Sequence, residues 1–95
     1  MITSKQRAAL RAMANTLEPV FQIGKSGLTG VIISQLDLAL EARELIKVTV
    51  HETADLSAKE ALTELCEKLR AEPVQHIGRK LVLFRRSREN PRIEI

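Results

Sequence analysis

The stretch Val20-Phe21-Gln22-Ile23-Gly24-Lys25-Ser26-Gly27-Leu28-Thr29 decides the fold, because it joins a short extended run to a helix through a glycine loop. Pro19 ends the helical segment before it, since proline lacks the N–H that a helix interior needs. Thr29 is a residue type that favours the cap position of a helix, and apolar residues at helical spacing follow it. The stretch therefore predicts a strand–loop–helix unit with its loop at Gly24–Gly27.

A strand and a helix are expected directly after this unit. Leu45–Val50 alternates apolar and polar side chains, which is typical of a half-buried strand. Ser57 and Glu60 form a capping box, and the apolar residues of Ala58–Leu69 recur at helical spacing. Pro73 is expected to end this helix.

Two strands and an initial helix complete the predicted architecture. Val74–Ile77 and Lys80–Arg86 are extended runs, and Gly78-Arg79 between them suits a two-residue hairpin turn. Near the N-terminus, Thr3 and Gln6 have the spacing of a capping box, which predicts a helix there.

The predicted order of helices and strands is αβαβαββ. Both strand–helix–strand segments are long enough for crossovers that return the chain to one sheet. We expect a two-layer α/β domain in which the helices cover a four-stranded mixed sheet, whose strand order the sequence leaves open. The domain is expected to span residues 1–86, and residues 87–95 are expected to form a polar, loosely ordered tail.

The composition excludes several classes of protein. The 95 residues suffice for one core, and with only Phe21 and Phe84 as aromatics that core is expected to be aliphatic. Cys66 is the only cysteine, and its place on the apolar side of a predicted helix favours a core residue over a nucleophile. His51 and His76 lie far apart, so neither a metal site nor a cofactor is expected. No apolar run could span a membrane and the N-terminus does not look like a signal region, so a cytoplasmic protein is expected.

The net charge is only +3, but the charges are unevenly distributed along the chain. The segment from Arg79 to Arg92 is strongly basic, whereas the segment Asp37–Glu72 is rich in acids. The first predicted helix adds three basic residues, Lys5, Arg7 and Arg11. If the two basic ends of the chain meet, the folded molecule carries a basic face of the kind that nucleic-acid-binding proteins show.

The loop Gly24–Gly27 has the features of a phosphate-binding site. Its glycines permit unusual backbone angles and leave the backbone open to close approach. Lys25 supplies a charge and Ser26 a hydroxyl, and the following helix directs free N–H groups towards them. A GxxG loop grips the nucleic-acid backbone in KH-type domains in this way. Because Phe21 and Phe84 are both needed in the core, backbone contact rather than base stacking is expected to dominate, with strong salt dependence.

The sequence argues against an enzyme. Gly24-Lys25-Ser26 looks like the end of a P-loop, but that motif needs a glycine where Pro19 stands. Glu60, Glu64 and Glu67 share one face of a predicted helix, which is the pattern of a solvated surface rather than of catalytic acids. No catalytic residue and no enzymatic activity are therefore expected.

Five segments stand in the order seen in the YhbY family, namely Thr3-Ser4-Lys5-Gln6-Arg7, Leu17-x-Pro19-Val20, Ile23-Gly24-Lys25-x-Gly27-Leu28-Thr29, Ala42-Arg43-Glu44-Leu45-Ile46-Lys47-Val48 and Ile77-Gly78-Arg79-x-Leu81-Val82-Leu83-Phe84-Arg85. From about Thr3 to Arg86 the chain resembles this family. Its members are stand-alone bacterial proteins with a single CRM domain (chloroplast RNA splicing and ribosome maturation). Two departures from the family pattern, Asn15 and His76, lie outside the glycine loop.

The resemblance implies a domain similar to the C-terminal domain of bacterial translation initiation factor three. It also implies RNA binding through the GxxG loop, and association with precursor large ribosomal subunits as an assembly factor. The RNA-binding residues that it indicates are Gly24, Lys25, Ser26, Gly27 and Thr29, with Lys5, Arg7, Arg11, Arg79, Lys80, Arg85 and Arg86 as the basic surround. A monomer is expected.

Two alternatives stay open. The first is a general RNA chaperone that uses the same residues but has no fixed binding site on the ribosome. The second is a protein-interaction module that docks a basic ribosomal protein through the acidic helix face Glu60–Glu72.

Overall fold

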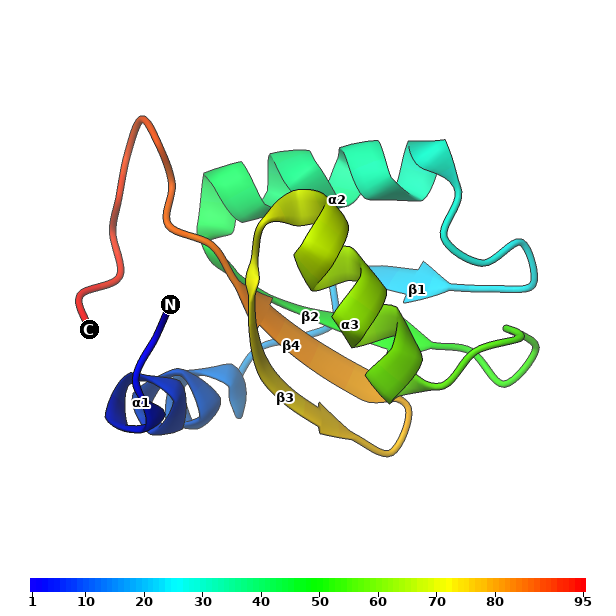
Figure 1. Cartoon of the computed structure of the whole chain (residues 1–95), viewed down its shortest axis with the longest axis horizontal. Coiled ribbons are helices and arrows are strands. Elements are labelled where there is room, and N and C mark those ends of the chain that lie inside the picture. The colour runs from blue at the N-terminus through cyan, green and yellow to red at the C-terminus, as the bar shows by residue number, and fades with distance from the viewer.

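Three helices and four strands follow one another in the computed structural model, which describes residues 1–95 (Figure 1). They are α1 (Ser4–Ala14), β1 (Phe21–Ile23), α2 (Gly30–Arg43), β2 (Leu45–Val50), α3 (Ala58–Leu69), β3 (Glu72–Ile77) and β4 (Lys80–Phe84). The expected α/β class and the order αβαβαββ are confirmed. None of the three helices is long and apolar enough to cross a membrane.

The four strands form one mixed sheet in the order β1-β2-β4-β3. β1 pairs with β2 in parallel, whereas β4 runs antiparallel to both β2 and β3. β1, β2 and β3 therefore run in the same direction, and α2 and α3 are the crossovers that such parallel strands require. The carboxyl ends of these three strands meet at one end of the sheet, which we call the loop end because Gly24–Gly27 follows β1 there.

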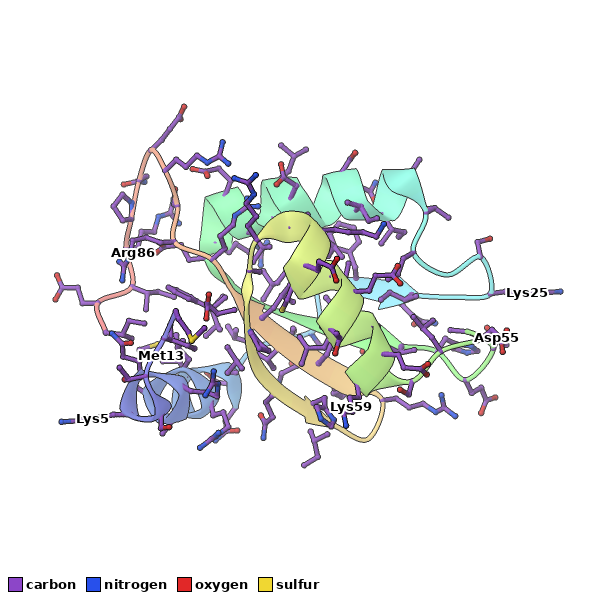
Figure 2. The ribbon with its side chains drawn as sticks, viewed as in Figure 1. Lys5, Met13, Lys25, Asp55, Lys59 and Arg86 are labelled. Carbon is purple, nitrogen blue, oxygen red and sulfur yellow. The ribbon has the colours of Figure 1, made fainter.

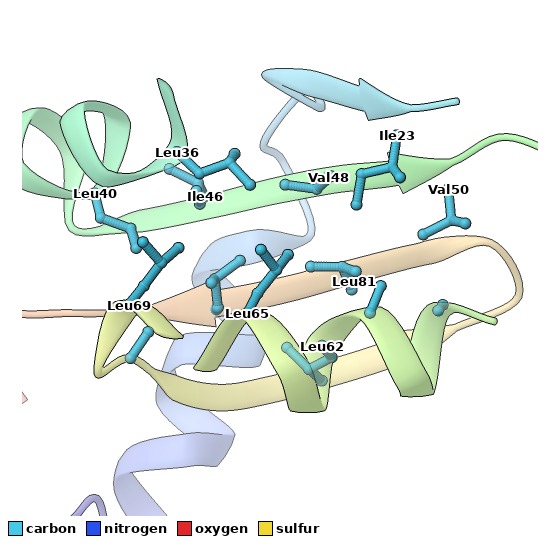
Figure 3. Close-up of a cluster of buried hydrophobic side chains, with 14 residues drawn as sticks. Ile23, Leu36, Leu40, Ile46, Val48, Val50, Leu62, Leu65, Leu69 and Leu81 are labelled. Atoms are coloured by element: carbon cyan, nitrogen blue, oxygen red, sulfur yellow. The ribbon is translucent and has the colours of Figure 1, made fainter. Parts of the chain in front are cut away.

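The main core lies between the sheet and the pair α2 and α3 (Figure 3). Alternation along β2 sends Ile46, Val48 and Val50 to this side, and each is at most 1% exposed. The helices supply Leu36 and Leu40 from α2 and Leu62, Leu65 and Leu69 from α3. The 14 buried residues of this cluster are all aliphatic, which confirms the aliphatic core expected from the composition.

A smaller core on the opposite face of the sheet carries α1. Leu10 and Ala14 of α1 pack there against Leu45, Val82 and Phe84. The reason is the same alternation, because these strand residues point away from the main core and still need cover. Helices thus lie on both faces, and the domain has a third layer where two were expected.

The predicted helix starts are confirmed by their caps. Thr3 and Ser57 each complete a capping box with the residue three positions later. Thr29 caps α2, since its hydroxyl accepts a hydrogen bond from the Ile32 N–H at 3.2 Å.

The end of α3 differs from the prediction that Pro73 would stop it. The helix already ends at Leu69, because Arg70 adopts a left-handed backbone with φ of 55°. Pro73 lies inside β3, which is an edge strand where the missing N–H of a proline is tolerated. β4 likewise ends at Phe84, short of the expected Arg86.

Residues 87–95 form no helix or strand, but they are tied to the domain rather than loose as expected. The carboxylates of Glu41 and Glu44 accept hydrogen bonds from the backbone N–H groups of Ser87, Arg88, Glu89, Arg92 and Ile93. Ile93 and Ile95 also pack against the smaller core. As a result, the C-terminus lies near α1 and the N-terminus, at the end of the molecule opposite the loop end (Figure 1). We call this region the terminal end.

Candidate nucleic-acid interface

Three connections come together at the loop end of the sheet. The His51 N–H donates to the Ile23 carbonyl at 2.8 Å, which fixes the start of the glycine loop beside the loop after β2. The Val50 N–H donates to the Arg79 carbonyl at 2.7 Å, which brings the β3–β4 turn to the same edge. Arg79 and Lys80 therefore share this end of the sheet with Gly24–Gly27.

The loop Gly24–Gly27 is a tight turn closed by its own backbone. The Gly27 N–H donates to the Gly24 carbonyl at 2.9 Å. Gly27 has a φ of +70°, a conformation that side chains disfavour, whereas Gly24 shows no positive φ. A Cβ added to either glycine would meet no atom within 4 Å. Packing inside the domain therefore requires neither glycine, and the loop backbone is open to a ligand.

Backbone donors of the loop and of the first turn of α2 lack partners within the protein. No hydrogen bond of the structure uses the N–H groups of Lys25, Ser26, Leu28, Gly30 and Val31. The first N–H groups of any helix are left free in this way, and the helix dipole adds positive potential there. Together with the exposed side chains of Lys25 and Ser26, these donors form a site suited to a phosphate group.

The charges around this loop are mixed. Lys25 extends outward from the tip of the loop (Figure 2), and Arg79 and Lys80 are exposed at the same end. The loop after β2 brings exposed acids as well, Glu52 and Asp55, and Figure 2 shows Asp55 at the same end as Lys25. The positive potential at the loop is therefore weaker than the basic residues alone would give.

The basic residues of α1 do not surround the loop, contrary to the expectation. Lys5 lies at one end of the longest axis and Lys25 at the other (Figure 2), in a molecule 35 Å long. The apolar side of α1 binds the smaller core, which holds the helix at the terminal end. Arg7 is partly engaged there, because its Nε–H donates to the Pro73 carbonyl at 3.0 Å. Arg11 is exposed on the same helix.

Arg85, another expected member of the basic surround, is committed to the fold. Its guanidinium donates to the Asp37 carboxylate at 2.7 Å, to the Asp37 carbonyl at 2.9 Å and to the Leu69 carbonyl at 3.0 Å. Only 13% of its side chain is exposed. Arg85 therefore ties the end of β4 to α2 and to the last turn of α3, and its charge does not face a ligand at the loop.

Arg86 lies at the terminal end rather than near the loop. Its guanidinium donates to the Ile93 carbonyl at 3.1 Å and lies 5.9 Å from the centre of the Phe84 ring. Figure 2 shows Arg86 at the same end of the molecule as Lys5, whereas Arg79 and Lys80 lie at the loop end. The expected basic surround is therefore divided between two ends of the molecule.

Sequence reasoning missed the role of Glu44. This side chain is fully buried and accepts three backbone hydrogen bonds, from Ser87, Arg92 and Ile93. Burial raises the pKa of its carboxyl group, but the three N–H donors outweigh that effect and hold the pKa below its ordinary value. The available signal was an acid directly before a buried strand, in a chain whose C-terminus is basic.

The thiol of Cys66 is half-buried, and the ring of His51 takes part in local hydrogen bonds. Burial, with the charge of Glu72, raises the pKa of the Cys66 thiol to about 12, so that the thiol stays protonated. His51 Nδ1 accepts a hydrogen bond from the Thr53 N–H at 3.1 Å and lies 2.8 Å from the Thr53 hydroxyl, which stabilises the loop after β2. No cluster of three or more His, Cys, Asp or Glu side chains could hold a metal ion.

Known proteins share this sequence and this fold. Residues 2–85 match the CRS1 / YhbY (CRM) domain. "Probable RNA-binding protein YqeI" of Bacillus subtilis is 42% identical over 95 residues, which cover 100% of this chain and 99% of the relative. "RNA-binding protein" of Haemophilus influenzae is 37% identical over 89 residues, which cover 93% and 89%. The solution structure of the hypothetical protein SAV1595 from Staphylococcus aureus matches with a TM-score of 0.84 at 45% identity, and the match covers 100% of this chain and 99% of that one.

The family match includes all three helices and all four strands of the structure, together with the glycine loop that carries the phosphate-binding geometry. The resemblance noted from the sequence is therefore confirmed, and this chain belongs to the CRS1 / YhbY (CRM) domain family.

Proposed function

We propose that this protein binds RNA and grips its phosphate backbone with the loop Gly24–Gly27. The observation that carries the proposal is the set of unpaired N–H groups at the positive end of α2, those of Lys25, Ser26, Leu28, Gly30 and Val31. Phosphate oxygens are the acceptors that such donors bind best. Relatives that align with most of this chain are named RNA-binding proteins, and these names support RNA as the nucleic acid.

We further propose that the RNA is ribosomal RNA in precursor large ribosomal subunits, and that the protein acts in the cytoplasm as a monomeric assembly factor without enzymatic activity. The support for this finer proposal is the YhbY-like sequence pattern, from the capping box at Thr3 to the strand that ends near Arg85. A general RNA chaperone would use the same loop, so only the identity of the bound RNA separates the two roles.

The acidic face of α3 has less support as a docking surface for a basic protein. One oxygen of the exposed Glu60 carboxylate is already engaged, because it accepts the Ser57 N–H at 2.9 Å in the capping box. Glu64 and Glu67 are the exposed acids in the middle of that face that make no hydrogen bond within the protein. Two exposed carboxylates on a solvated helix are an ordinary surface feature.

The test of the loop is RNA binding by the wild type and by Lys25→Glu at low and at moderate salt. Lys68→Glu is the matched control, because it makes the same charge change at an exposed position on α3. We expect Lys25→Glu to lose about tenfold or more in affinity and to flatten the salt dependence, since a phosphate contact is replaced by repulsion. Equal affinities for the two variants would remove the loop from the binding site.

The test of the ribosomal role is the RNA that crosslinks to the protein in cells. We expect strong enrichment of precursor large-subunit RNA, at a few fixed sites, and loss of that enrichment in Lys25→Glu. A broad set of unrelated RNAs without fixed sites would favour the chaperone instead.

A further inference from the structure

A second candidate site lies at the terminal end, away from the glycine loop. A cavity of about 630 Å³ opens between the end of α1, the segment that enters β1, the start of β2 and the C-terminal tail. We call it the tail cavity. Its apolar walls include Leu17, Val20 and Ile93. This volume is in the range of about 300–1,000 Å³ that small-molecule sites in proteins show.

The charged residues of the tail cavity favour an anion. Three cationic side chains line it, Arg43, Lys47 and Arg92, against the single acid Glu18. Arg43 and Arg92 are exposed and Lys47 is half-buried, and none of the three makes a side-chain hydrogen bond or an ion pair within the protein. The cavity therefore combines an apolar surface with unpaired positive charge, which suits a planar apolar group that carries a phosphate.

The start of β2 adds polar backbone groups to this wall. Pairing of β1 with β2 begins at Phe21 opposite Val48, and the Val20 N–H reaches the Lys47 carbonyl at 2.8 Å. Before that point Leu45 has no strand on the cavity side of β2, and its backbone N–H and C=O point to that side, whereas those of Ile46 point to β4. An open strand edge presents alternating donors and acceptors, which are the groups that recognise the polar edge of a nucleobase.

The tail builds one side of the cavity and is held there rigidly. The Glu44 carboxylate accepts the N–H groups of Arg92 at 2.7 Å and of Ile93 at 2.8 Å. The Arg86 guanidinium binds the Ile93 carbonyl from the other direction. These bonds fix the backbone from which the Arg92 and Ile93 side chains line the cavity. Both residues lie beyond residues 2–85, which match the family domain.

We propose that the tail cavity holds one unpaired nucleotide of the RNA that the glycine loop grips, with the base on the apolar wall and the phosphate between Arg43 and Arg92. This inference rests on the proposed function. β1 connects the two sites directly, since Val20 lines the cavity and Gly24 begins the loop. Four residues of extended chain span roughly 13 Å, so one RNA strand that follows β1 reaches both sites.

The first experiment is a titration of adenosine monophosphate, followed by the amide NMR signals of the protein. We expect the largest shifts at Leu17, Lys47 and Ile93, and we expect them to persist in Lys25→Glu, because the mononucleotide needs only the cavity. Arg92→Ala is expected to weaken this binding by about tenfold, since it removes a charge-assisted hydrogen bond. Arg88→Ala is the matched control, because Arg88 is an exposed arginine of the same tail that does not line the cavity. No shifts at the cavity, or equal effects of the two substitutions, would overturn the proposal.

The second experiment separates bound RNA from free mononucleotide as the occupant. RNA affinity is measured for Arg92→Ala, Arg43→Ala and Arg88→Ala, whose amide spectra also report that the fold is intact. We expect the first two to weaken RNA binding and the third to leave it unchanged. If mononucleotide binding falls but RNA binding does not, the cavity takes a free nucleotide and the proposal is wrong. The proposed function of the loop has a separate test. It fails if Lys25→Glu binds RNA as tightly as the wild type does, whatever the result at the cavity.

Discussion

The carboxylate of Glu44 accepts a hydrogen bond from the backbone N–H of Arg92 at 2.7 Å, across 48 residues of sequence. Glu44 is also one of two non-glycine residues with a positive φ, at 67°, where the chain turns from α2 into β2. A side chain in this conformation costs conformational energy of order 1–3 kcal/mol, which the surrounding structure must offset. The three backbone donors of the tail supply that compensation, so that the turn and the tail stabilise each other.

Glu44→Gln is expected to destabilise the protein by about 2–4 kcal/mol. Both carboxylate oxygens are in use, one by Ser87 and the other by Arg92 and Ile93. A glutamine offers one acceptor oxygen and turns its amide N–H groups towards N–H donors. Urea unfolding measures the change, with the exposed Glu89→Gln as control. Equal stability of the two variants would show that the tail contacts contribute nothing.

The contacts that hold the tail are expected to weaken progressively as the pH falls below about 4.5. The Ser87 hydroxyl and the N–H groups of Arg88 and Glu89 hold the pKa of Glu41 below its ordinary value, and the pKa of Glu44 is lowered too. A carboxylate whose folded pKa is depressed stabilises the fold fully above its unfolded pKa, near 4.5, and loses that contribution as the pH falls through the folded pKa. Urea midpoints of the wild type and of Glu44→Gln should therefore converge in acid. Convergence already near neutral pH would contradict this assignment.

Local signals in the sequence were sufficient for most of the fold. The caps at Thr3, Thr29 and Ser57 and the alternation along Leu45–Val50 act over a few residues, and the structure has each of them where the pattern placed it. The early end of α3 was missed because Arg70, a residue with no turn preference, takes the left-handed position.

Long-range contacts explain what the sequence could not predict about the site. A run of basic residues does not reveal that Arg85 is held by Asp37 in α2, or that Glu44 binds the tail, because both pairs are distant in sequence. The same applies to Lys5 and Lys25, which lie at opposite ends of the molecule because α1 covers the smaller core. Composition showed the charges, but only the packing of α1 and of the tail decides where they lie.

Gly24→Ala is expected to leave stability unchanged and to weaken RNA binding. The added Cβ meets no protein atom within 4 Å, and Gly24 has no positive φ, so that the folded domain tolerates it. The methyl group would stand instead where an RNA backbone approaches the loop. Gly27→Ala is the contrasting variant, because its φ of +70° adds a folding cost of about 1 kcal/mol. Thermal unfolding and RNA titration of both variants separate the two effects, and full RNA affinity of Gly24→Ala would argue against close backbone contact at this position.

Arg85→Ala is expected to cost about 2 kcal/mol of stability and to leave RNA affinity nearly unchanged. The guanidinium binds Asp37 and the Leu69 carbonyl, but its Nε is buried without a partner, which reduces the net gain. Arg88→Ala is the control, because the Arg88 side chain is exposed and makes no hydrogen bond or ion pair within the protein. Urea unfolding and RNA titration are measured on both. A loss of RNA affinity in a folded Arg85→Ala protein would show that Arg85 belongs to the RNA-binding surface.

Asp55→Asn is expected to raise RNA affinity by about twofold at low salt, since a single repulsion at roughly 10 Å in water amounts to a few tenths of a kcal/mol. Asp55 is exposed at the same end of the molecule as Lys25, in the loop that the His51–Ile23 hydrogen bond fixes beside the glycine loop. Removal of its charge therefore strengthens the positive potential that a phosphate meets there. The gain should vanish at high salt, where screening shortens the range of the repulsion to a few ångströms. Glu67→Gln, the same loss of charge on the exposed face of α3, should change nothing at either salt concentration. Equal gains in the two variants would mean that RNA affinity depends on net charge alone. That result would argue against RNA binding at the loop end.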